Sequence, residues 1–172
     1  MSQLTSFPID CFDRRPIDQI NEDIKLSTNS IDILQMDVES IRKDHSDSIH
    51  MALESKKNLH VRILTLDPSS PYIARRAHQL GITFAEHRQQ THKSIRELIS
   101  GFDGYNFFLQ VYDDYPTQIT FSIDESIYVS TIALNRRSRE LCTFKLHRES
   151  PGADRSFGFQ FDSIWATSRE YK

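Results

Sequence analysis

Cysteine and glycine are scarce in this sequence, and long runs of basic or apolar residues are missing. Only two cysteines, Cys11 and Cys142, occur in the 172 residues, with no Cys-x-x-Cys pair or Cys/His cluster. A structural zinc site is therefore not expected, and a reducing cytoplasm is the expected compartment. No apolar run approaches the ~20 residues that cross a bilayer, and the first twenty residues lack the apolar segment of a signal peptide.

Several motifs of known chemistry are also missing. Walker loops, Gly-x-Gly-x-x-Gly and the serine-nucleophile motifs do not occur. His87 and His92 lie five residues apart on one expected helix, which turns them to different faces and not toward a shared metal. A net charge of −3, without a run of Lys or Arg, disfavours general nucleic-acid binding through counterion release. We therefore expect no cofactor, no bound metal and no nucleic-acid partner.

The length and the hydrophobic share of 38% predict one globular domain, residues 15–172, after an N-terminal arm of residues 1–14. Periodic spacing of apolar residues separates expected helices from expected strands. The expected helices span 16–26, 38–55, 71–80, 84–101 and 157–165. The expected strands span 30–36, 59–66, 105–112, 117–123, 126–134 and 141–147.

The order of these elements predicts an α/β fold. Helices separate the first three strands, which favours parallel pairing through right-handed crossovers. Tight connections join the later strands, which favours antiparallel pairing. We therefore expect a mixed parallel and antiparallel sheet flanked by helices.

The stretch VRILTLDPSSPYIARRAHQLG, residues 61–81, carries the clearest local signal for ligand binding. A compact apolar strand ends at Asp67, and a Ser-Ser-Pro start begins the helix that follows. Free N–H groups in the first helical turn, together with the helix dipole, favour an anion there. Ser69, Ser70 and Arg75 could then hold a phosphate or a carboxylate. The alternative is that Ser70 only caps the helix and that Arg75 makes surface ion pairs.

Acidic residues follow three of the expected strands, namely Asp37, Asp67 and the pair Asp113 and Asp114. If those strands are parallel neighbours, their carboxyl ends meet at one sheet edge, where open α/β folds bind ligands. Carboxylates gathered there could coordinate Mg²⁺. The alternative is that Asp37 caps a helix and that the others stabilise turns.

Four segments, taken in order, resemble the phospholipase-D-like domain family. The resemblance is to small bacterial members in which one such unit stands alone or is fused to regulatory domains. The segments are PIDQINEDIKLSTNSIDIL, HVRILTLDPSSPYIARRAHQLG, LQVYDDYPTQITFSIDESIYVS and FGFQFDSIWATS. The resemblance implies a phospholipase-D-like half unit as the fold, and a homodimer, since such units often pair.

The superfamily signature is His-x-Lys, followed after four further residues by Asp. Its histidine attacks phosphorus, and its lysine holds the phosphate oxygens. The resemblance places Asp124 at the signature aspartate, Thr117 at the histidine and Ile119 at the lysine. Thr131 and Ile132 stand where a glycine and a serine usually follow. The hydrolase activity of the family is therefore not expected here.

These observations favour a binding or regulatory module without catalytic residues, and the resemblance implies a role in bacterial signalling or defence. Its expected partner is a phosphorylated, nucleotide-like small molecule or a protein. The alternative is a phosphodiesterase or nuclease that uses acidic residues with a divalent metal. The candidate ligand-binding residues are Asp67, Ser69, Ser70, Arg75, Asp113 and Asp124.

Overall fold

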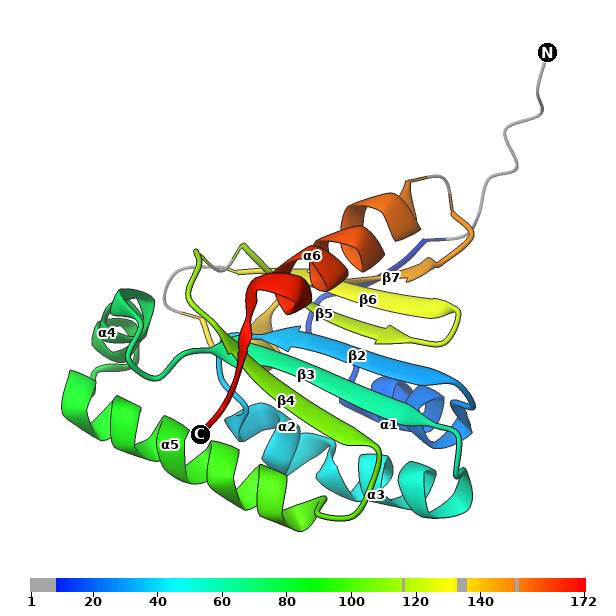
Figure 1. Cartoon of the computed structure of the whole chain (residues 1–172). Helices are drawn as coiled ribbons and strands as arrows, with labels where there is room; N and C mark the ends of the chain where they lie inside the picture. The colour runs from blue at the N-terminus through cyan, green and yellow to red at the C-terminus, as the bar shows by residue number, and fades with distance from the viewer. Residues whose placement is uncertain (1–8, 116, 133–135, 151) are drawn as a thin grey trace.

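A computed structural model describes residues 9–115, 117–132, 136–150 and 152–172. These residues form an 8-stranded sheet, with spatial order β1-β7-β6-β5-β2-β3-β4-β8, and helices on both of its faces (Figure 1). The strands are β1 (Asp10–Phe12), β2 (Ser30–Gln35), β3 (His60–Leu66), β4 (Phe107–Tyr112), β5 (Gln118–Ile123), β6 (Ser126–Thr131), β7 (Thr143–His147) and β8 (Arg169–Glu170). The helices are α1 (Ile17–Leu26), α2 (Glu39–Asp44), α3 (Ser46–Ser55), α4 (Pro71–Leu80), α5 (Phe84–Gly101) and α6 (Phe159–Thr167).

The pairing of the strands confirms the expected α/β class. Strands β2, β3 and β4 are parallel neighbours, as their helical crossovers predict. Strand β5 pairs antiparallel with both β2 and β6, and β6 pairs antiparallel with β7. The short strands β1 and β8 add antiparallel edges to the two sides of the sheet.

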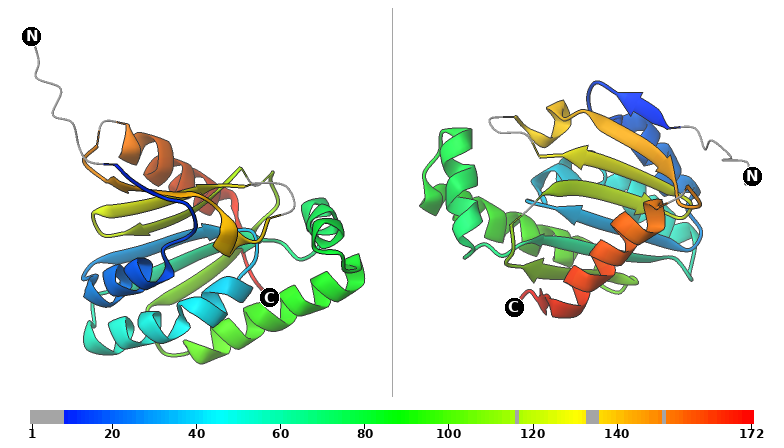
Figure 2. Two further views of the ribbon diagram at one scale, coloured as in Figure 1. Left: turned by 180° about the vertical axis from the view of Figure 1, so that it is seen from behind. Right: turned by 90° about the horizontal axis from the view of Figure 1, so that it is seen from above.

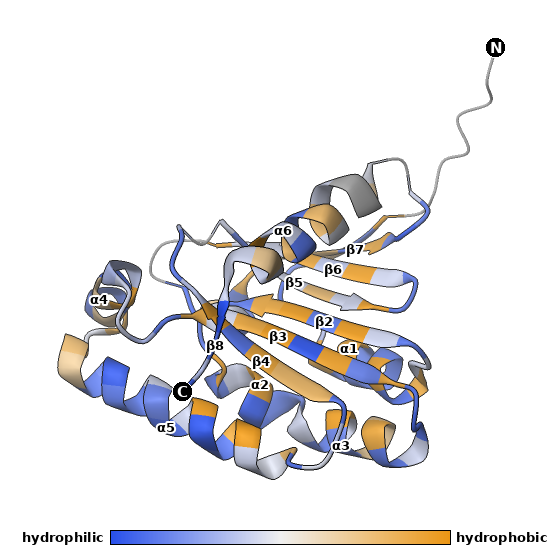
Figure 3. Cartoon of the chain, viewed as in Figure 1, coloured by the Kyte–Doolittle hydropathy of each residue, from blue (hydrophilic) through white to orange (hydrophobic). Residues whose placement is uncertain are grey.

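The core lies on the two faces of this sheet. Helices α1, α2, α3 and α5 cover one face, and α6 crosses the other (Figure 2). The larger apolar cluster joins Ile33 and Phe121 of the sheet to Ile20, Ile49 and Ile95 of the helices. A smaller cluster lies beneath α6. Figure 3 shows the apolar strands in the middle of the sheet and many polar residues along α5.

Two details differ from the sequence-based expectation. The single helix expected over 38–55 is two helices that meet at His45, whose φ of −130° is not helical. The strands β1 and β8 were not predicted, because two or three residues at an edge show no periodicity. Residues 133–134, the end expected for one strand, lie outside the described residues.

The strand register fixes which residues share the functional edge of the sheet. Leu66 is the partner of Tyr112, so the acidic residues that follow β3 and β4 lie at the same carboxyl edge. Strand β5 begins at this edge and runs to the opposite one. Helix α4 lies beside the carboxyl edge (Figure 1). Within the described part of the chain, no helix is both long and apolar enough to cross a membrane.

Candidate functional site

Asp67 closes the turn between β3 and α4. Its carboxylate is buried and accepts hydrogen bonds from the backbone N–H of Ser69 at 2.9 Å and from the Ser69 hydroxyl at 2.6 Å. Arg169 of β8 also pairs with it. Burial acts to raise the pKa of Asp67, but the Ser69 hydrogen bonds and the charge of Arg169 outweigh it and lower that pKa. The carboxylate is therefore ionised and already partnered.

The two serines and the two arginines of this segment have different positions. Ser70 is buried, and its hydroxyl accepts a hydrogen bond from the Tyr72 backbone N–H at 3.2 Å, so it caps α4. Arg75 is exposed on α4, whereas its neighbour Arg76 is 5% exposed and faces inward. The structure thus brings Asp67, Ser69 and Ser70 together and directs Arg76, not Arg75, toward the sheet edge.

The remaining two candidates lie at opposite ends of the sheet. Asp113 is exposed directly after β4 and lies at the carboxyl edge beside Asp67. Asp124 follows β5 at the other edge, since Ile123 is the partner of Ile31 near the start of β2. The structure therefore does not bring Asp124 together with the other candidates.

Asp124 has a clear role within the fold. It has a positive φ of 46°, and its carboxylate accepts backbone N–H bonds from Thr28 at 2.7 Å, Asn29 at 3.0 Å and Ser30 at 2.9 Å. Burial acts to raise the pKa of Asp124, but the hydrogen bonds from Ser30, Thr28 and Asn29 outweigh it and lower that pKa. Asp124, which the resemblance places at the signature aspartate, therefore joins the β5–β6 turn to the start of β2.

The two residues that the resemblance places at the signature histidine and lysine lie at or near the carboxyl edge. Thr117 is exposed just before β5. Ile119 is 1% exposed and belongs to the apolar cluster under α1, α3 and α5. Neither side chain offers a cation or an imidazole at this edge.

Sequence reasoning missed Arg15, which is the most unusual side chain of this region. It is 3% exposed, and none of its three guanidinium nitrogens has a hydrogen-bond partner within the described residues. Its guanidinium lies 5.1 Å from the centre of the Phe121 ring. Burial lowers the pKa of Arg15 to about 10, although the charges of Asp37 and Asp44 oppose this shift. The side chain is therefore still a cation at neutral pH, enclosed and without a hydrogen bond to any described residue.

Arg76 of α4 and His87 of α5 are two further buried groups, and the charge of Arg76 acts on His87. Both are 5% exposed, and the Arg76 Nε and the His87 Nε2 have no partner in the part of the chain described. The Arg76 Nη1 donates to the carbonyl oxygen of Arg136 at 3.0 Å. Burial lowers the pKa of His87, with the charge of Asp37 opposing the shift and that of Arg76 adding to it.

Asp37, two residues after the end of β2, acts electrostatically on each of these groups, Arg15, Arg76 and His87. We call Arg15, Arg76 and His87 the edge cluster. A cavity of about 380 Å³ reaches Asp37 and His87 from the groove between α2 and α5. It gives a small molecule a route to one side of the cluster. The Arg15 nitrogens are shielded from solvent.

A signal in the sequence could have identified two members of the edge cluster. Arg76 lies between the buried residues Ile73 and Ala77 of the α4 pattern. His87 begins the buried row that continues through Thr91 on α5. A charged or titratable residue on the apolar face of an expected helix therefore indicates a buried polar group that could belong to a site. Nothing comparable marks Arg15, which precedes α1.

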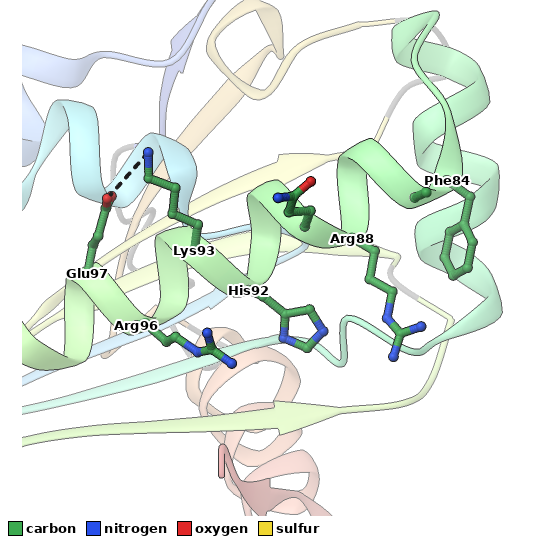
Figure 4. Close-up of a pocket in the computed structure, with 8 residues that line it drawn as sticks. Phe84, Arg88, His92, Lys93, Arg96 and Glu97 are labelled. Atoms are coloured by element: carbon green, nitrogen blue, oxygen red, sulfur yellow. Dashed lines mark ion pairs between the residues drawn. The ribbon is translucent and has the colours of Figure 1, made fainter.

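A second basic surface lies on the outer side of α5. Arg88, His92 and Arg96 project from the same side of the helix, as Figure 4 shows, beside an open depression of about 850 Å³. Arg88 and Arg96 are exposed, and the structure gives neither a hydrogen bond nor an ion pair within the described residues. Burial and these two charges lower the pKa of His92, whose Nδ1 lies 2.6 Å from the Tyr171 hydroxyl. We call Arg88, His92 and Arg96 the α5 row.

The acidic residues do not gather into a metal site. Across the residues that the structure describes, no three His, Cys, Asp or Glu side chains lie close enough together to hold a metal ion. Asp67 is instead bound by Ser69 and Arg169. The described part of the chain therefore gives the metal-dependent alternative no ligand set.

Comparisons with known proteins give similarity only at the level of structure. No protein-family model matches the sequence, and no curated protein matches it. NucT from Helicobacter pylori superposes with a TM-score of 0.64 at 12% identity, over 96% of this chain and 100% of that one. The phospholipase D family member Nuc from Salmonella typhimurium gives 0.58 at 10% identity, over 97% and 98%.

A third solved structure is larger than this chain. The archaeal chromatin protein TrmBL2, described with a novel mode of DNA binding, gives a TM-score of 0.58 at 12% identity. The match covers 99% of this chain but only 57% of TrmBL2, so the chain spans little more than half of that protein. Identities this low establish the fold alone. With its mixed sheet, its flanking helices and these structural relatives, the chain has the phospholipase-D-like fold.

Proposed function

We propose that this chain binds a phosphorylated, nucleotide-like small molecule at the carboxyl edge of its sheet and does not hydrolyse it. One observation carries the proposal: Arg15, Arg76 and His87 are buried within the electrostatic reach of Asp37, and each has nitrogen atoms without a partner among the described residues. A buried donor without a partner costs on the order of 1–3 kcal/mol. A ligand whose oxygens accept hydrogen bonds from the arginine nitrogens explains why these groups are kept.

The chemistry of the edge cluster suits a phosphoryl group. Guanidinium groups bind phosphate oxygens through charge-assisted and often bidentate hydrogen bonds. The charges that act on Arg15 and Arg76 are those of Asp37, Asp44, Arg137 and Arg139, so four arginines face two aspartates, and the net positive charge favours an anion. The adjoining cavity of about 380 Å³ lies within the common range of small-molecule sites, about 300–1,000 Å³. A nucleotide-sized ligand therefore matches both the charge and the volume.

Binding without hydrolysis is the part of the proposal that depends on the resemblance. The family mechanism needs a histidine nucleophile and a lysine, and Thr117 and Ile119 occupy those positions. We expect no cleavage of a model phosphodiester above the buffer rate, with or without Mg²⁺ or Mn²⁺. Metal-dependent cleavage that Asp67→Asn abolishes would instead support the phosphodiesterase or nuclease alternative.

The adjacent arginines of α4 provide a matched test of the binding site. Arg76→Gln should weaken the binding of adenosine monophosphate about 10- to 100-fold, because a charge-assisted hydrogen bond contributes about 1.5–3 kcal/mol. Arg75→Gln removes the same charge from an exposed position and should leave the affinity unchanged. Isothermal titration calorimetry measures both, after thermal unfolding shows that both variants are folded.

Two outcomes would count against this site. Equal losses for Arg76→Gln and Arg75→Gln would show that only the overall charge of α4 matters. A wild-type chain that binds neither adenosine monophosphate nor inorganic pyrophosphate at millimolar concentration would remove the proposal.

A regulatory role also belongs to the proposal. The resemblance supports signalling or defence in bacteria, a protein partner as the alternative ligand, and assembly as a homodimer. In that setting the bound ligand would report a cellular state, and the chain would pass the signal on by contact with its partner.

A second candidate function is contact with nucleic acid, and the α5 row favours it. Arg88 and Arg96 are exposed and have no partner within the described residues. Successive members of the row are spaced by one helical turn, about 6 Å along the axis. A structural relative, TrmBL2, is described as binding DNA. This observation weakens the sequence-based expectation that nucleic acid is not a partner.

Replacing both arginines of the α5 row tests this second function. Arg88→Gln together with Arg96→Gln should reduce the affinity for a fluorescein-labelled single-stranded oligonucleotide, measured by fluorescence anisotropy. The slope of log affinity against log salt should fall by about 1.4, which corresponds to two lost phosphate contacts on a single strand. Arg75→Gln serves as the control. An unchanged slope would exclude the α5 row as the contact surface.

A further inference from the structure

The two cysteines, which the sequence separates widely, meet in the structure. Cys11 lies in β1, and Cys142 lies one residue before β7. Their Sγ atoms are 3.8 Å apart, and both residues are exposed as free thiols. No sequence motif indicates this contact, because the residues are 131 positions apart.

The strand register explains why the sulfur atoms touch. Cys11 is the partner of Phe144 and Phe12 is the partner of Thr143, so Cys142 lies diagonally across from Cys11. A disulfide needs an S–S distance of about 2.05 Å, so the sulfur atoms must approach by roughly 1.8 Å. Strand β1 has 3 residues and, among the described strands, pairs only with β7. A short edge strand held on one side can make this small adjustment.

We propose that Cys11 and Cys142 form an oxidisable dithiol site that reacts with a small-molecule disulfide such as oxidised glutathione. One cysteine thiolate attacks the glutathione disulfide, forms a mixed disulfide and releases one glutathione thiolate. The second cysteine then attacks the protein sulfur of the mixed disulfide and displaces the other glutathione. Two protein thiols are oxidised to one disulfide, one glutathione disulfide is reduced to two thiols, and these take up the two protons.

The surroundings of Cys11 determine at which pH this exchange is fast. The contact with Cys142, followed by desolvation, raises the pKa of Cys11. Since the thiolate is the nucleophile, exchange should be slow at neutral pH and faster at alkaline pH. A reducing compartment would keep the pair as thiols at rest, and an oxidising change would close the bridge.

The bridge would hold β1 against β7. It would close a long covalent loop that includes most of the sheet, and cross-links over long loops restrict the unfolded chain most strongly. Oxidation should therefore raise the unfolding temperature of the whole chain by roughly 5–10 °C. Reduction with dithiothreitol should return it to the starting value.

Mass spectrometry of the intact chain after incubation with oxidised glutathione tests the proposal. The wild-type chain should lose two hydrogen atoms in mass and both reactive thiols, and a non-reducing digest should contain the Cys11 and Cys142 peptides joined together. Cys11→Ser and Cys142→Ser should each stop at one stable glutathione adduct, since the second thiol is then missing. These variants change exposed side chains, so their folding is expected to be retained.

Other products would overturn the proposal. Two glutathione adducts on one wild-type chain would show that the thiols react independently. A covalent dimer of two chains would show that the cysteines pair between molecules. The intact mass and the non-reducing digest do not depend on phosphate binding. This test and the test of the proposed function can therefore fail separately.

Discussion

Arg15→Met should stabilise the ligand-free protein and abolish the binding of its phosphorylated ligand. The two effects are expected together because Arg15 is 3% exposed and its guanidinium nitrogens have no hydrogen-bond partner within the described residues. A buried charge without hydrogen bonds costs folding free energy. The same charge becomes favourable when an anion lies beside it.

The size of the stabilisation follows from what methionine removes and keeps. Methionine has a similar length, so its thioether can fill the space near Phe121, where the guanidinium lies 5.1 Å from the ring centre. Loss of the unpaired charge should raise the free energy of unfolding by about 1–3 kcal/mol. That corresponds to roughly 3–10 °C in unfolding temperature for a chain of this size. The backbone bond from the Arg15 N–H to the Arg139 carbonyl oxygen is unaffected.

Thermal unfolding and calorimetry with adenosine monophosphate give the two readouts. Arg14→Met is the matched control, because Arg14 is the exposed neighbour of Arg15. This variant should change neither the unfolding temperature nor the affinity for adenosine monophosphate. If Arg15→Met destabilises the chain, its charge serves the fold rather than a ligand. If the variant is stabilised but binds normally, the edge cluster is not the site.

Asp124→Ala should destabilise the protein by about 3 kcal/mol, the upper end for groups that lose their hydrogen-bond partner, without altering ligand binding. The substitution removes the acceptor of three backbone N–H groups, those of Thr28, Asn29 and Ser30. Charge-assisted hydrogen bonds of this kind are among the stronger ones in proteins. The backbone φ of 46° adds strain, because alanine tolerates this region less well than aspartate or asparagine.

The pH dependence of the free energy of unfolding shows how much the negative charge of Asp124 contributes to stability. Because its folded pKa is lowered, its stabilisation is complete above the ordinary unfolded value of about 3.9. The stabilisation is lost as the pH falls through the lower folded value. In Asp124→Asn, which keeps the turn but not the charge, the free energy of unfolding should change less with pH below about 4.

Urea unfolding between acidic and neutral pH provides the measurement. Asp113→Ala is the control, since Asp113 is exposed at the other sheet edge, and it should change stability by less than about 0.5 kcal/mol. Equal free energies of unfolding for the wild-type chain and Asp124→Ala would show that water can replace the carboxylate as hydrogen-bond acceptor for the three N–H groups. Loss of ligand affinity in Asp124→Ala would return Asp124 to the candidate site.

Most of the sheet could be predicted because its strands are long and apolar. The helical crossovers between β2, β3 and β4 predict their parallel order, and the short turns predict the antiparallel remainder. The break between α2 and α3 could not be predicted. His45 is buried at the break, with its Nδ1 2.7 Å from the Asn21 Oδ1. Ile41 and Ile49 stay buried on its two sides, so the helical period continues across it.

The site was less predictable than the fold, for a physical reason. Asp67, Ser69 and Ser70 are close in sequence, so their turn and capping hydrogen bonds need no contact between distant segments. Arg15 is positioned by contacts with Phe121 and Arg139, which lie far away in the sequence. Local sequence patterns do not predict contacts between segments so far apart. The resemblance located Asp124 at a signature position, but its hydrogen bonds to the start of β2 are again contacts between distant segments.

The shielding of Arg15 has a kinetic consequence. A ligand cannot reach its nitrogens while the surrounding chain stays closed, so association requires a local opening. Strand β1 is a low-energy element to open, because only 3 residues join it to β7 and it leads directly into Arg15. The association rate would then be limited by how often β1 detaches, and the apparent affinity would fall in proportion to the small open fraction.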